Sequence, residues 1–404
     1  MFKRDLKLIE NENLLVFGPR GVGKTTYLKN SDFFHRSLYI NLLKAEEENR
    51  FSKNPDELAN IVRALSADIQ YVIIDEVQKL PKLLDIVHDL IESSDRPPSV
   101  KFILTGSSAR KLKKEGVNLL AGRAFVYSMF PLCITECMDG TEEKFKLDEA
   151  LQFGMLPKVF EYDSTLKKLK YLEAYTHTYL KEEIWAEHVI RDLAPFRYFL
   201  QVAAQMNGKE VNFSNIARDV GASDATVIRY YAILEDTLLG FFLQPFQHSF
   251  RKRLSKTPKF YFFDTGVVRA LLGRLSVPLE HGTFTYGEAF EHFIILQCRQ
   301  LATYHRYEYR FSFLRTKDDA EIDLIVERPG QRTLFIEIKS ASNVSPDMLR
   351  TLSHLTEDLK KFGECEALCF SQDPYPKQVG SIRVLPWREG VKTYFGGNQL
   401  SNSH

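Results

Sequence analysis

Gly18-Pro-Arg-Gly-Val-Gly-Lys-Thr25 is the stretch that decides the fold of this 404-residue chain. It fills every fixed position of the pattern G-x-x-x-x-G-K-[ST]. Apolar residues 14–17 before it predict a buried strand, and residues 25–28 after it predict the first turn of a helix. Glycines let a backbone wrap a phosphate group, and a helix N-terminus adds partial positive charge. The stretch therefore predicts a phosphate-binding loop in an α/β domain.

The residue types in this loop suit a nucleotide. Lys24 is expected to reach the β- and γ-phosphates of ATP, and the Thr25 hydroxyl to hold Mg²⁺. A glycine-rich turn without a ligand is the alternative, and it leaves the filled pattern between a strand and a helix unexplained. The residues predicted to contact the nucleotide here are Gly18, Pro19, Arg20, Gly21, Val22, Gly23, Lys24, Thr25 and Thr26.

Two adjacent carboxylates end a second apolar strand, which covers residues 71–75. Charged groups are seldom buried without a partner, so this ending requires a reason. Asp75 is expected to complete the Mg²⁺ shell, and Glu76 to orient or activate the attacking water. A strand followed by an acidic turn is the alternative. Thr105, at the end of the next predicted strand, is a weaker candidate for sensing the γ-phosphate.

Asp75-Glu-Val-Gln78 and Leu120-Ala-Gly-Arg123 give the chain a further resemblance. With the phosphate-binding loop, they resemble a bacterial and archaeal group of the AAA-type ATPases. In AAA proteins an arginine just before the fifth strand often serves as the finger of a neighbouring subunit. The resemblance implies that Arg123 neutralises charge on the transferring phosphoryl group across a homo-oligomer interface. A surface arginine paired with a carboxylate is the alternative.

Composition limits the class of protein. A net charge of +1 with 44% hydrophobic and 26% charged residues is typical of soluble globular proteins. No run approaches the ~18 apolar residues of a membrane helix, and the N-terminus lacks a signal-peptide core. We therefore expect a cytoplasmic protein without membrane contact. The five cysteines are an odd number, which does not suggest a disulfide framework. Cys365 and Cys369 lie four apart in a predicted strand, where they would not chelate one ion well, so buried thiols are expected.

The middle of the chain carries the pattern of a helix-turn-helix. Residues 211–221 and 222–234 predict two helices joined at a glycine, with Ser223 as the N-cap of the second. Residues 240–244 and 259–263 predict the hairpin of a wing. Contact with DNA phosphates and packing against neighbouring parts of the protein are the two interpretations. The residues expected at DNA are Thr226, Arg229 and Tyr230, with Arg251, Lys252, Arg253 and Lys256 at the wing tip.

Asp323, Glu337 and Lys339 form a second chemical constellation. Asp323 interrupts an apolar strand, and Glu337 and Lys339 share one face of the next strand by the period of two. A helix, three strands, a helix and a strand around them resemble the PD-(D/E)xK nuclease superfamily. The resemblance implies that Asp323, Glu337 and the helical Glu291 hold Mg²⁺ or Mn²⁺, and that Lys339 positions or activates a water. A surface edge strand is the alternative.

These features divide the chain into four predicted units of an α/β protein. They are a P-loop AAA-type parallel sheet over 1–138, with a surface loop at 46–50, a helical lid or spacer over 139–205, a winged helix-turn-helix over 206–270 and a PD-(D/E)xK nuclease-like α/β domain over 271–404. This arrangement resembles a widespread prokaryotic family whose C-terminal domain was long catalogued as of unknown function.

The resemblance implies a Mg²⁺-dependent ATPase that binds DNA. Its nucleotide state would control metal-dependent cleavage or the remodelling of branched DNA. The alternative is a nucleotide-gated switch that acts through a protein partner in defence or toxin–antitoxin control. In that case the C-terminal domain would bind DNA without cutting it.

Overall fold

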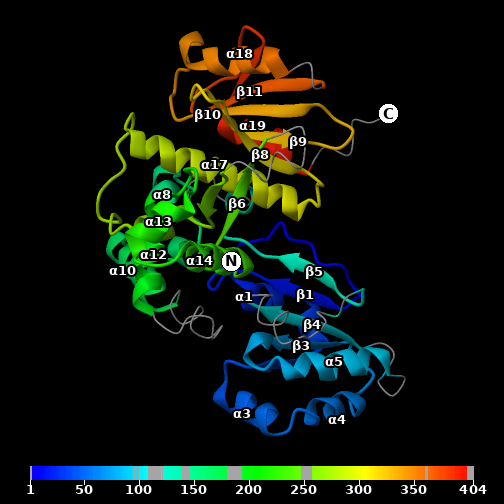
Figure 1. Cartoon of the computed structure of the whole chain (residues 1–404). Coiled ribbons are helices and arrows are strands. Elements are labelled where there is room, and N and C mark those ends of the chain that lie inside the picture. The colour runs from blue at the N-terminus through cyan, green and yellow to red at the C-terminus, as the bar shows by residue number, and fades with distance from the viewer. Residues whose placement is uncertain are drawn as a thin grey trace.

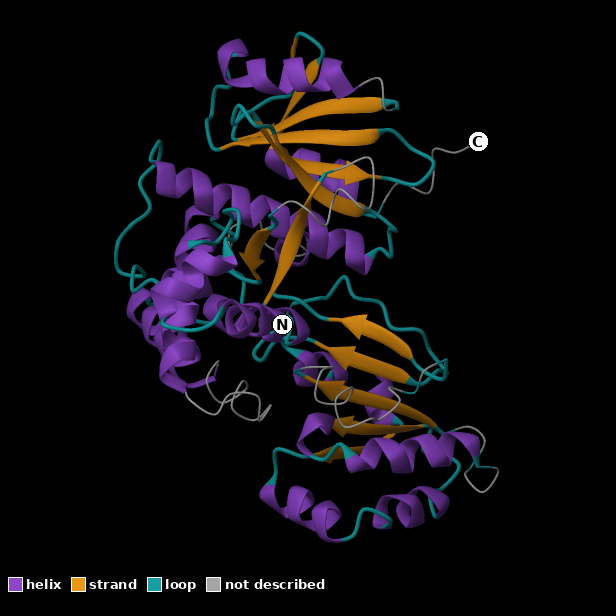
Figure 2. Ribbon diagram, in the orientation of Figure 1, coloured by secondary structure: helices purple, strands orange, loops and turns teal. Residues whose placement is uncertain are grey.

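The computed structural model of the protein describes residues 2–93, 97, 100–107, 120, 122–138, 145–179, 193–246, 257–359 and 363–397. Two sheets lie at opposite ends of the molecule, and a group of helices lies between and beside them (Figure 1). Figure 2 shows that one long helix crosses the region between the two sheets. This helix is α17, Phe284–Tyr304.

The first sheet is parallel and five-stranded, with the order β2-β3-β4-β1-β5. The order places the phosphate-binding loop, which follows β1, next to the carboxyl end of β4 and one strand away from that of β3. The predicted parallel sheet around the nucleotide motifs is confirmed. Its strands are β1 Leu14–Phe17, β2 Ser37–Asn41, β3 Tyr71–Asp75, β4 Lys101–Gly106 and β5 Phe125–Ser128.

Helices cover this sheet, and one of them corrects a prediction. The expected surface loop at 46–50 is wrong, because these residues belong to α3, Ala45–Lys53. Their acidic side chains lie in the first turn, where the helix dipole favours negative charge, and Phe51 is buried. The remaining helices here are α1 Lys24–Lys29, α2 Asp32–His35, α4 Glu57–Arg63, α5 Lys82–Glu92 and α7 Ile134–Met138.

The two faces of the first sheet enter different cores. Leu15 and Phe17 point into a core shared with the helices α3 to α5. Leu14 and Val16 point into a second core that continues through the middle helices to α17 and the end of the chain. Because side chains alternate along β1, one face of the first sheet packs against α3 to α5 and the other packs against the rest of the molecule.

Most of the described residues after the first sheet are helical, as predicted, with short connections between the helices. A π-helical turn, Tyr175–Tyr179, extends α10, and residues 180–189 of the expected long helix lie outside the described residues. The helices are α8 Leu147–Phe153, α9 Pro157–Phe160, α10 Thr165–Ala174, α12 Leu193–Gln205, α13 Phe213–Val220 and α14 Asp224–Asp236.

The helices α13 and α14 meet at a glycine turn, as the sequence predicts. Gly221 has φ of 66°, which favours glycine, and the Ser223 hydroxyl accepts a hydrogen bond from the Thr226 amide as an N-cap. The prediction of Tyr230 as an exposed contact residue is wrong. Its ring is buried against Phe196 and Phe199, because α14 packs on α12 through this face, whereas Arg229 is exposed.

The predicted hairpin forms, but it belongs to a larger sheet. Strands β6, Gly240–Pro245, and β7, Lys259–Phe262, pair in antiparallel fashion, and the basic tip lies outside the described residues. Strand β6 also pairs in parallel with β8 of the C-terminal region. The hairpin is therefore the edge of an eight-stranded sheet with the order β12-β13-β11-β10-β9-β8-β6-β7.

The C-terminal region has the expected helix, three strands, helix and strand in that order. Strands β9 and β10 are antiparallel, and β10 and β11 are parallel. Two further strands and a helix that the sequence analysis did not predict complete it. The helix α16, Thr265–Leu271, precedes this region. The elements of the region are α17, β8 Arg310–Arg315, β9 Glu321–Glu327, β10 Thr333–Lys339, α18 Arg350–Leu359, β11 Cys365–Ser371, β12 Lys377–Val379, β13 Ile382–Pro386 and α19 Trp387–Phe395.

His292 ties the hairpin to α17 and predicts a pH effect on stability. Its Nε2 donates to the Phe262 carbonyl at 2.6 Å, and burial lowers the pKa of His292 from 6.5 to about 4. The folded chain keeps the ring neutral while the unfolded chain takes up a proton below pH 6.5. This stabilisation is therefore complete above pH 6.5 and is lost as the pH falls towards 4, by about 3 kcal/mol.

His292→Gln keeps a donor for the carbonyl but cannot take up the proton. Denaturant unfolding followed by tryptophan fluorescence should show that the variant loses less stability than the wild type between pH 7 and pH 4. Equal losses in both proteins would contradict the prediction.

Candidate functional site

The phosphate-binding loop follows β1 beside the end of β4, and its first glycine, Gly18, has no room for a side chain. The Gly18 amide donates to the Gly106 carbonyl at 3.2 Å. A Cβ atom on Gly18 would lie 2.3 Å from the Met129 carbonyl oxygen, a contact that only displacement of the loop would relieve. Lys24 is buried inside the loop, where its Nζ donates to the Gly18 carbonyl at 2.6 Å and the Pro19 carbonyl at 3.3 Å.

Asp75 is the centre of the hydroxyl network beside the loop. Its Oδ2 accepts from the Thr25 hydroxyl at 2.7 Å and from the Tyr39 hydroxyl at 2.8 Å, and its Oδ1 accepts from the Thr105 hydroxyl. The structure thus brings together the predicted residues Thr25, Asp75 and Thr105. Tyr39 on β2 was missed, because nothing in its local sequence marks it. Burial and the Asp75 carboxylate raise the pKa of Tyr39, so its hydroxyl remains a donor.

Glu76 follows in a conformation that few non-glycine residues adopt. Its φ is 65°, in the left-handed region, and such strain is found chiefly where function requires it. Gln78 fixes the side chain, since its Nε2 donates to Glu76 Oε2 at 2.5 Å and to Ser107 Oγ at 3.0 Å. Gln78 is the last residue of the Asp-Glu-x-Gln motif, and this contact gives the motif a physical role.

The π-helical turn after α10 touches the loop from the other side. The Tyr175 hydroxyl donates to the Arg20 carbonyl at 2.8 Å. A Cβ atom on Gly21 would lie 3.0 Å from the Tyr171 hydroxyl, so these two tyrosines cover the loop closely. The helical segment predicted as a lid therefore contacts the loop through aromatic side chains.

Arg4 connects the loop to the C-terminal region. Its guanidinium donates to the Val22 carbonyl at 2.9 Å, the Phe130 carbonyl at 2.6 Å and the Tyr304 hydroxyl at 3.0 Å, and it pairs with Glu136 at 3.0 Å. Burial opposes this charge, but Tyr304 and Glu136 hold the pKa of Arg4 above its usual value. Arg4 was not predicted as a site residue, because a single arginine near the N-terminus belongs to no recognisable motif.

A cavity of about 500 Å³ opens along α1 next to the loop. It lies between the N-terminal segment and α1, and the Tyr27 hydroxyl holds that segment by donating to the Leu6 carbonyl at 2.8 Å. The lining mixes apolar side chains with charged side chains and with groups of the loop, so it offers a ring both apolar and polar contacts. The lining includes Phe2, Leu6, Leu8, Gly23, Thr26, Tyr27, Met129, Leu132 and Pro157.

Arg123 lies away from this network and pairs with Glu92 at the end of α5. Its Nε is 2.6 Å from Glu92 Oε1, and both side chains are partly exposed. The ion pair matches the alternative that the sequence left open, but an exposed pair is worth less than about 1 kcal/mol and can open readily. The predicted role across a subunit interface stays a prediction. Most of the segment before Arg123, residues 108–119, lies outside the described residues.

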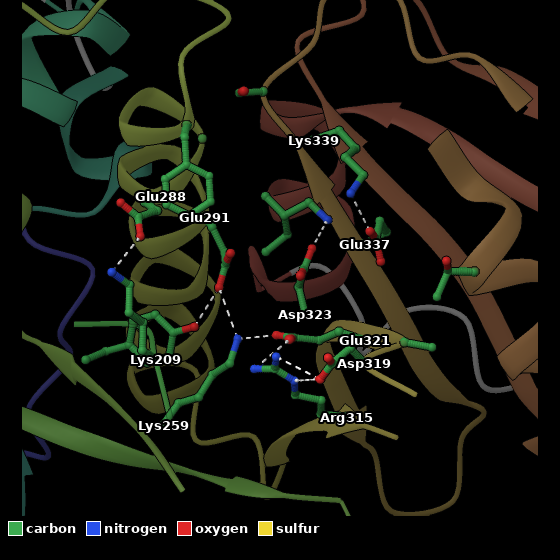
Figure 3. A pocket seen from close by; sticks show the side chains of 18 of the residues that line it. Lys209, Lys259, Glu288, Glu291, Arg315, Asp319, Glu321, Asp323, Glu337 and Lys339 are labelled. Carbon is green, nitrogen blue, oxygen red and sulfur yellow. Dashed lines mark hydrogen bonds and ion pairs between the residues drawn. The ribbon is translucent and has the colours of Figure 1, made fainter. Parts of the chain in front are cut away.

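The second predicted constellation lines a cavity of about 510 Å³ in the C-terminal region (Figure 3). Glu291 enters it from α17, Asp323 from β9, and Glu337 and Lys339 from β10. The structure therefore brings all four predicted residues to one cavity. Lining residues that the sequence analysis did not assign to the site include Lys209, Lys259, Tyr261, Glu288, Arg315 and Glu321.

Asp323, Glu337 and Lys339 form one end of this cavity. Asp323 Oδ2 accepts from the Ile338 amide at 2.7 Å, and Lys339 Nζ lies 2.5 Å from Glu337 Oε1. Burial and the charge of Glu337 raise the pKa of Asp323. Burial also raises the pKa of Glu337, against the effect of Lys339. Part of the shift of Asp323 comes from the neighbouring Glu337 charge, and a bound cation would relieve that repulsion.

Glu291 lies at the other end and already has partners. Its Oε1 accepts from the Tyr261 hydroxyl at 2.7 Å, and Lys259 Nζ lies 3.7 Å away. Lys259 also pairs with Glu321. Burial opposes the charge of Lys259, but Glu291 and Glu321 hold its pKa above the usual value.

One carboxylate oxygen in the cavity suits a metal ion, but the side chains around it do not form a complete metal site. Glu337 Oε2 is buried without a hydrogen-bond partner, an arrangement that a bound cation would satisfy. Within the described ranges, however, no three His, Cys, Asp or Glu side chains are grouped so that they could hold a metal ion. The C-terminal metal site therefore stays a prediction.

In the part of the chain that the structure describes, no helix has the length and apolar character needed to cross a membrane. The five cysteines, all of them among the described residues, form no disulfide, and Cys365 alone is partly exposed. The expectation of buried thiols rather than disulfides is thus confirmed for the other four.

Comparison with protein families agrees with part of the sequence analysis. Residues 10–138 match the family described as an AAA domain, and they include the phosphate-binding loop, Asp75 and Thr105. Residues 144–277 and 286–389 match two families described as domains of unknown function, DUF8612 and DUF4143. The AAA-type first unit is therefore supported by both its sheet and its family. The winged helix and the nuclease-like domain stay predictions.

Two similar whole proteins are described as uncharacterized. One of Mycobacterium tuberculosis is 28% identical over 354 residues, which cover 86% of this chain and 74% of that protein. One of Haemophilus influenzae is 22% identical over 339 residues, covering 80% of this chain and 79% of its own. The similarity spans most of the three matched regions, so these regions occur together in other proteins.

Solved structures also show a weak similarity to this chain. The Aeropyrum pernix ORC2 protein is 14% identical with a TM-score of 0.36, over 66% of this chain and 87% of that one. A variant of Thermotoga maritima RuvB is 16% identical with a TM-score of 0.31, over 61% and 87%. Scores this low do not bear on the function of this chain.

Proposed function

We propose that the AAA domain of this protein binds ATP with Mg²⁺ and hydrolyses it. The observation that carries the proposal is the convergence of the Thr25, Asp75 and Thr105 oxygens beside the buried amine of Lys24. Mg²⁺, when bound, neutralises charge on the β- and γ-phosphates, and Thr25 and Asp75 would hold it. The cavity along α1 would take the nucleoside.

Glu76 would hold the attacking water and receive its proton. Gln78 fixes the carboxylate in place before the nucleotide arrives, so the water meets an oriented base. The strained backbone of Glu76 is consistent with this role, because the surrounding contacts maintain a conformation that the free residue disfavours.

Glu76→Gln should lower the steady-state rate of ATP hydrolysis by about a hundredfold or more, because an amide is a poor base. Binding of a fluorescent ADP analogue should be unchanged. Lys24→Ala should instead abolish that binding, since it removes the cation of the loop. Gln78→Ala should slow hydrolysis less than Glu76→Gln. Hydrolysis by Glu76→Gln at the wild-type rate would show that another residue orients the water.

Arg123 would act on the nucleotide of a neighbouring copy, which requires a homo-oligomer. The ion pair with Glu92 is partly exposed, so the guanidinium lies near the surface. Separating it from Glu92 costs little free energy. Mixing Arg123→Ala protein with Lys24→Ala protein should restore part of the hydrolysis that each has lost, since an intact site forms where the two meet. Full activity of Arg123→Ala alone, or a wild-type monomer in sedimentation with ATP, would exclude this role.

The nucleotide state would reach the C-terminal cavity through Arg4 and α17. Arg4 bonds the loop carbonyl of Val22 and the hydroxyl of Tyr304, and Tyr304 ends the helix that also carries Glu291. A change in the loop on binding ATP would therefore alter contacts of this helix. This chain of hydrogen bonds is the physical basis of the coupling that we propose.

The C-terminal cavity would bind a phosphodiester of DNA. A divalent cation, when bound, supplies positive charge to the phosphate, and Asp323 and Glu337 would hold it. Lys339 would position the water that attacks. The exposed Arg229 on α14 would add a phosphate contact, so binding should weaken as salt rises.

Asp323→Ala should abolish cleavage of DNA in Mn²⁺ and leave ATP hydrolysis intact, because the two sites lie in different sheets. Lys339→Ala should bind Mn²⁺ but cut no DNA. The assay compares linear, forked and four-way substrates with and without ATP. If the wild type binds no Mn²⁺ and cuts none of these substrates, the C-terminal region is a binding module without nuclease activity.

A nucleotide-gated switch with a protein partner is the second candidate. Ile228 is 50% exposed on α14 and Tyr198 is 65% exposed on α12, and exposed apolar side chains suit a protein contact better than a phosphate. Hydrolysis that is slow and insensitive to DNA would favour this candidate over the first.

A further inference from the structure

A second cavity, of about 390 Å³, adjoins the C-terminal cavity and lies between α12, α16 and the first turns of α17. We call it the α16 cavity. The two cavities share Asn207, Lys209 and Glu288, and the last two side chains pair at 3.4 Å (Figure 3). Among the described residues, the C-terminal cavity is lined by six acidic and four basic side chains. The α16 cavity is lined by one acidic side chain, Glu288, and by three basic ones, Lys209, Arg269 and Arg274.

Arg269 is the buried member of this basic set, with 8% of its surface exposed. Its Nη2 donates to the Arg274 carbonyl at 2.6 Å and also to the Val277 carbonyl. Its Nε is buried without a hydrogen-bond partner, and within the described ranges the guanidinium pairs with no carboxylate. Burial and the charge of Arg274 lower the pKa of Arg269. The two carbonyls hold the turn after α16, but they leave a buried positive charge unbalanced, and buried charges are ordinarily paired.

Other groups around the α16 cavity also favour an anion. Asn207 Oδ1 accepts from the Phe262 amide at 2.8 Å, which leaves the Nδ2 of this side chain to donate to a ligand. Thr285 lies in the first turn of α17, where no acidic residue offsets the positive end of the helix dipole. Arg274 is exposed and pairs with no carboxylate of the described residues. Lys209 differs from the two arginines, because Glu288 already balances its charge.

We propose that the α16 cavity binds a phosphate monoester, with Arg269 and Arg274 supplying positive charge and Asn207 a hydrogen bond. A phosphate monoester carries between about 1.5 and 2 negative charges at neutral pH, which matches two arginines that lack a carboxylate partner. The volume lies toward the lower end of the range of about 300–1,000 Å³ that small-ligand sites occupy. This inference depends on neither ATP hydrolysis nor the C-terminal metal site.

Titration with inorganic phosphate, followed by the broadening of its phosphorus NMR line, tests the site directly. The full chain is used in a Lys24→Ala background, which removes the cation of the first phosphate site. Arg269→Gln should weaken phosphate binding by about tenfold or more, because it removes the buried charge. Arg332→Gln is the matched control and should change nothing, since Arg332 is 62% exposed, pairs with Glu364 and lines neither cavity.

Two further variants keep the inference testable should Arg269→Gln fail to fold. Arg274→Gln should weaken phosphate binding by about threefold, because an exposed charge contributes less than a buried one. Glu288→Gln should instead strengthen it by about threefold, because it removes the acidic side chain of the lining and releases Lys209. A residue that only holds the turn after α16 would not produce these opposite shifts.

A short DNA strand with and without a 5′-phosphate, followed by fluorescence anisotropy, distinguishes the source of the phosphate group. Tighter binding of the phosphorylated strand, lost in Arg274→Gln, would identify a DNA end as the ligand. Equal binding of the two strands, together with binding of inorganic phosphate, would identify a free phosphorylated compound. If neither inorganic phosphate nor the phosphorylated strand binds, or if Arg274→Gln and Glu288→Gln bind phosphate equally, the inference is overturned. The proposed ATPase and metal site would then be unaffected, because neither takes part in these measurements.

Discussion

The buried guanidinium of Arg4 is the interaction on which the arrangement of the molecule depends. It binds the phosphate-binding loop, the segment just after β5 and α17 at once, and one carboxylate, Glu136, balances its charge. Loss of the arginine would leave Glu136 buried and unpaired, a change that commonly costs about 3–5 kcal/mol. The hydrogen bonds of Arg4 also fix the distances between these three parts of the chain, because each part supplies a different acceptor. The phosphate-binding loop and α17 are therefore held in position by the same side chain.

Both candidate sites use the same physical device, a cluster of carboxylates held ready by nearby donors. At the first site, Asp75 is surrounded by hydroxyl donors from two strands and a helix, and these donors are neutral. At the second site the donors include the charged amines of Lys259 and Lys339. A neutral shell exchanges readily for a metal ion, while a charged shell competes with it. A divalent ion would therefore meet competition from charged amines at the proposed C-terminal site and only neutral donors at the first.

The sequence predicted much of the fold and many of the residues that the structure brings together at the two candidate sites, for reasons that are local. The loop pattern, the apolar strands and the capped helix α14 are visible in short windows, and Glu337 and Lys339 share a face by strand alternation. Contacts made by residues outside these motifs could not be predicted. Tyr39, Arg4 and Lys259 reach their sites from β2, the N-terminal segment and the hairpin, and only the tertiary fold brings them there. The same limit explains why Tyr230 was wrongly predicted to be exposed. The residue pattern of α14 does not reveal that α12 packs against this side chain.

The hairpin of β6 and β7 has a consequence for the descent of such chains. It completes the C-terminal sheet and supplies both Lys259 and Tyr261 to Glu291, although it lies before α16 and α17 in the chain. A recombination junction placed at α17 would leave β8 as an open edge and Glu291 without its partners. Gene fusions that transfer the C-terminal region intact must therefore carry the chain from Gly240 onward. The closed form of the C-terminal sheet thus depends on a hairpin that lies ahead of residue 286, where the family match of this region begins.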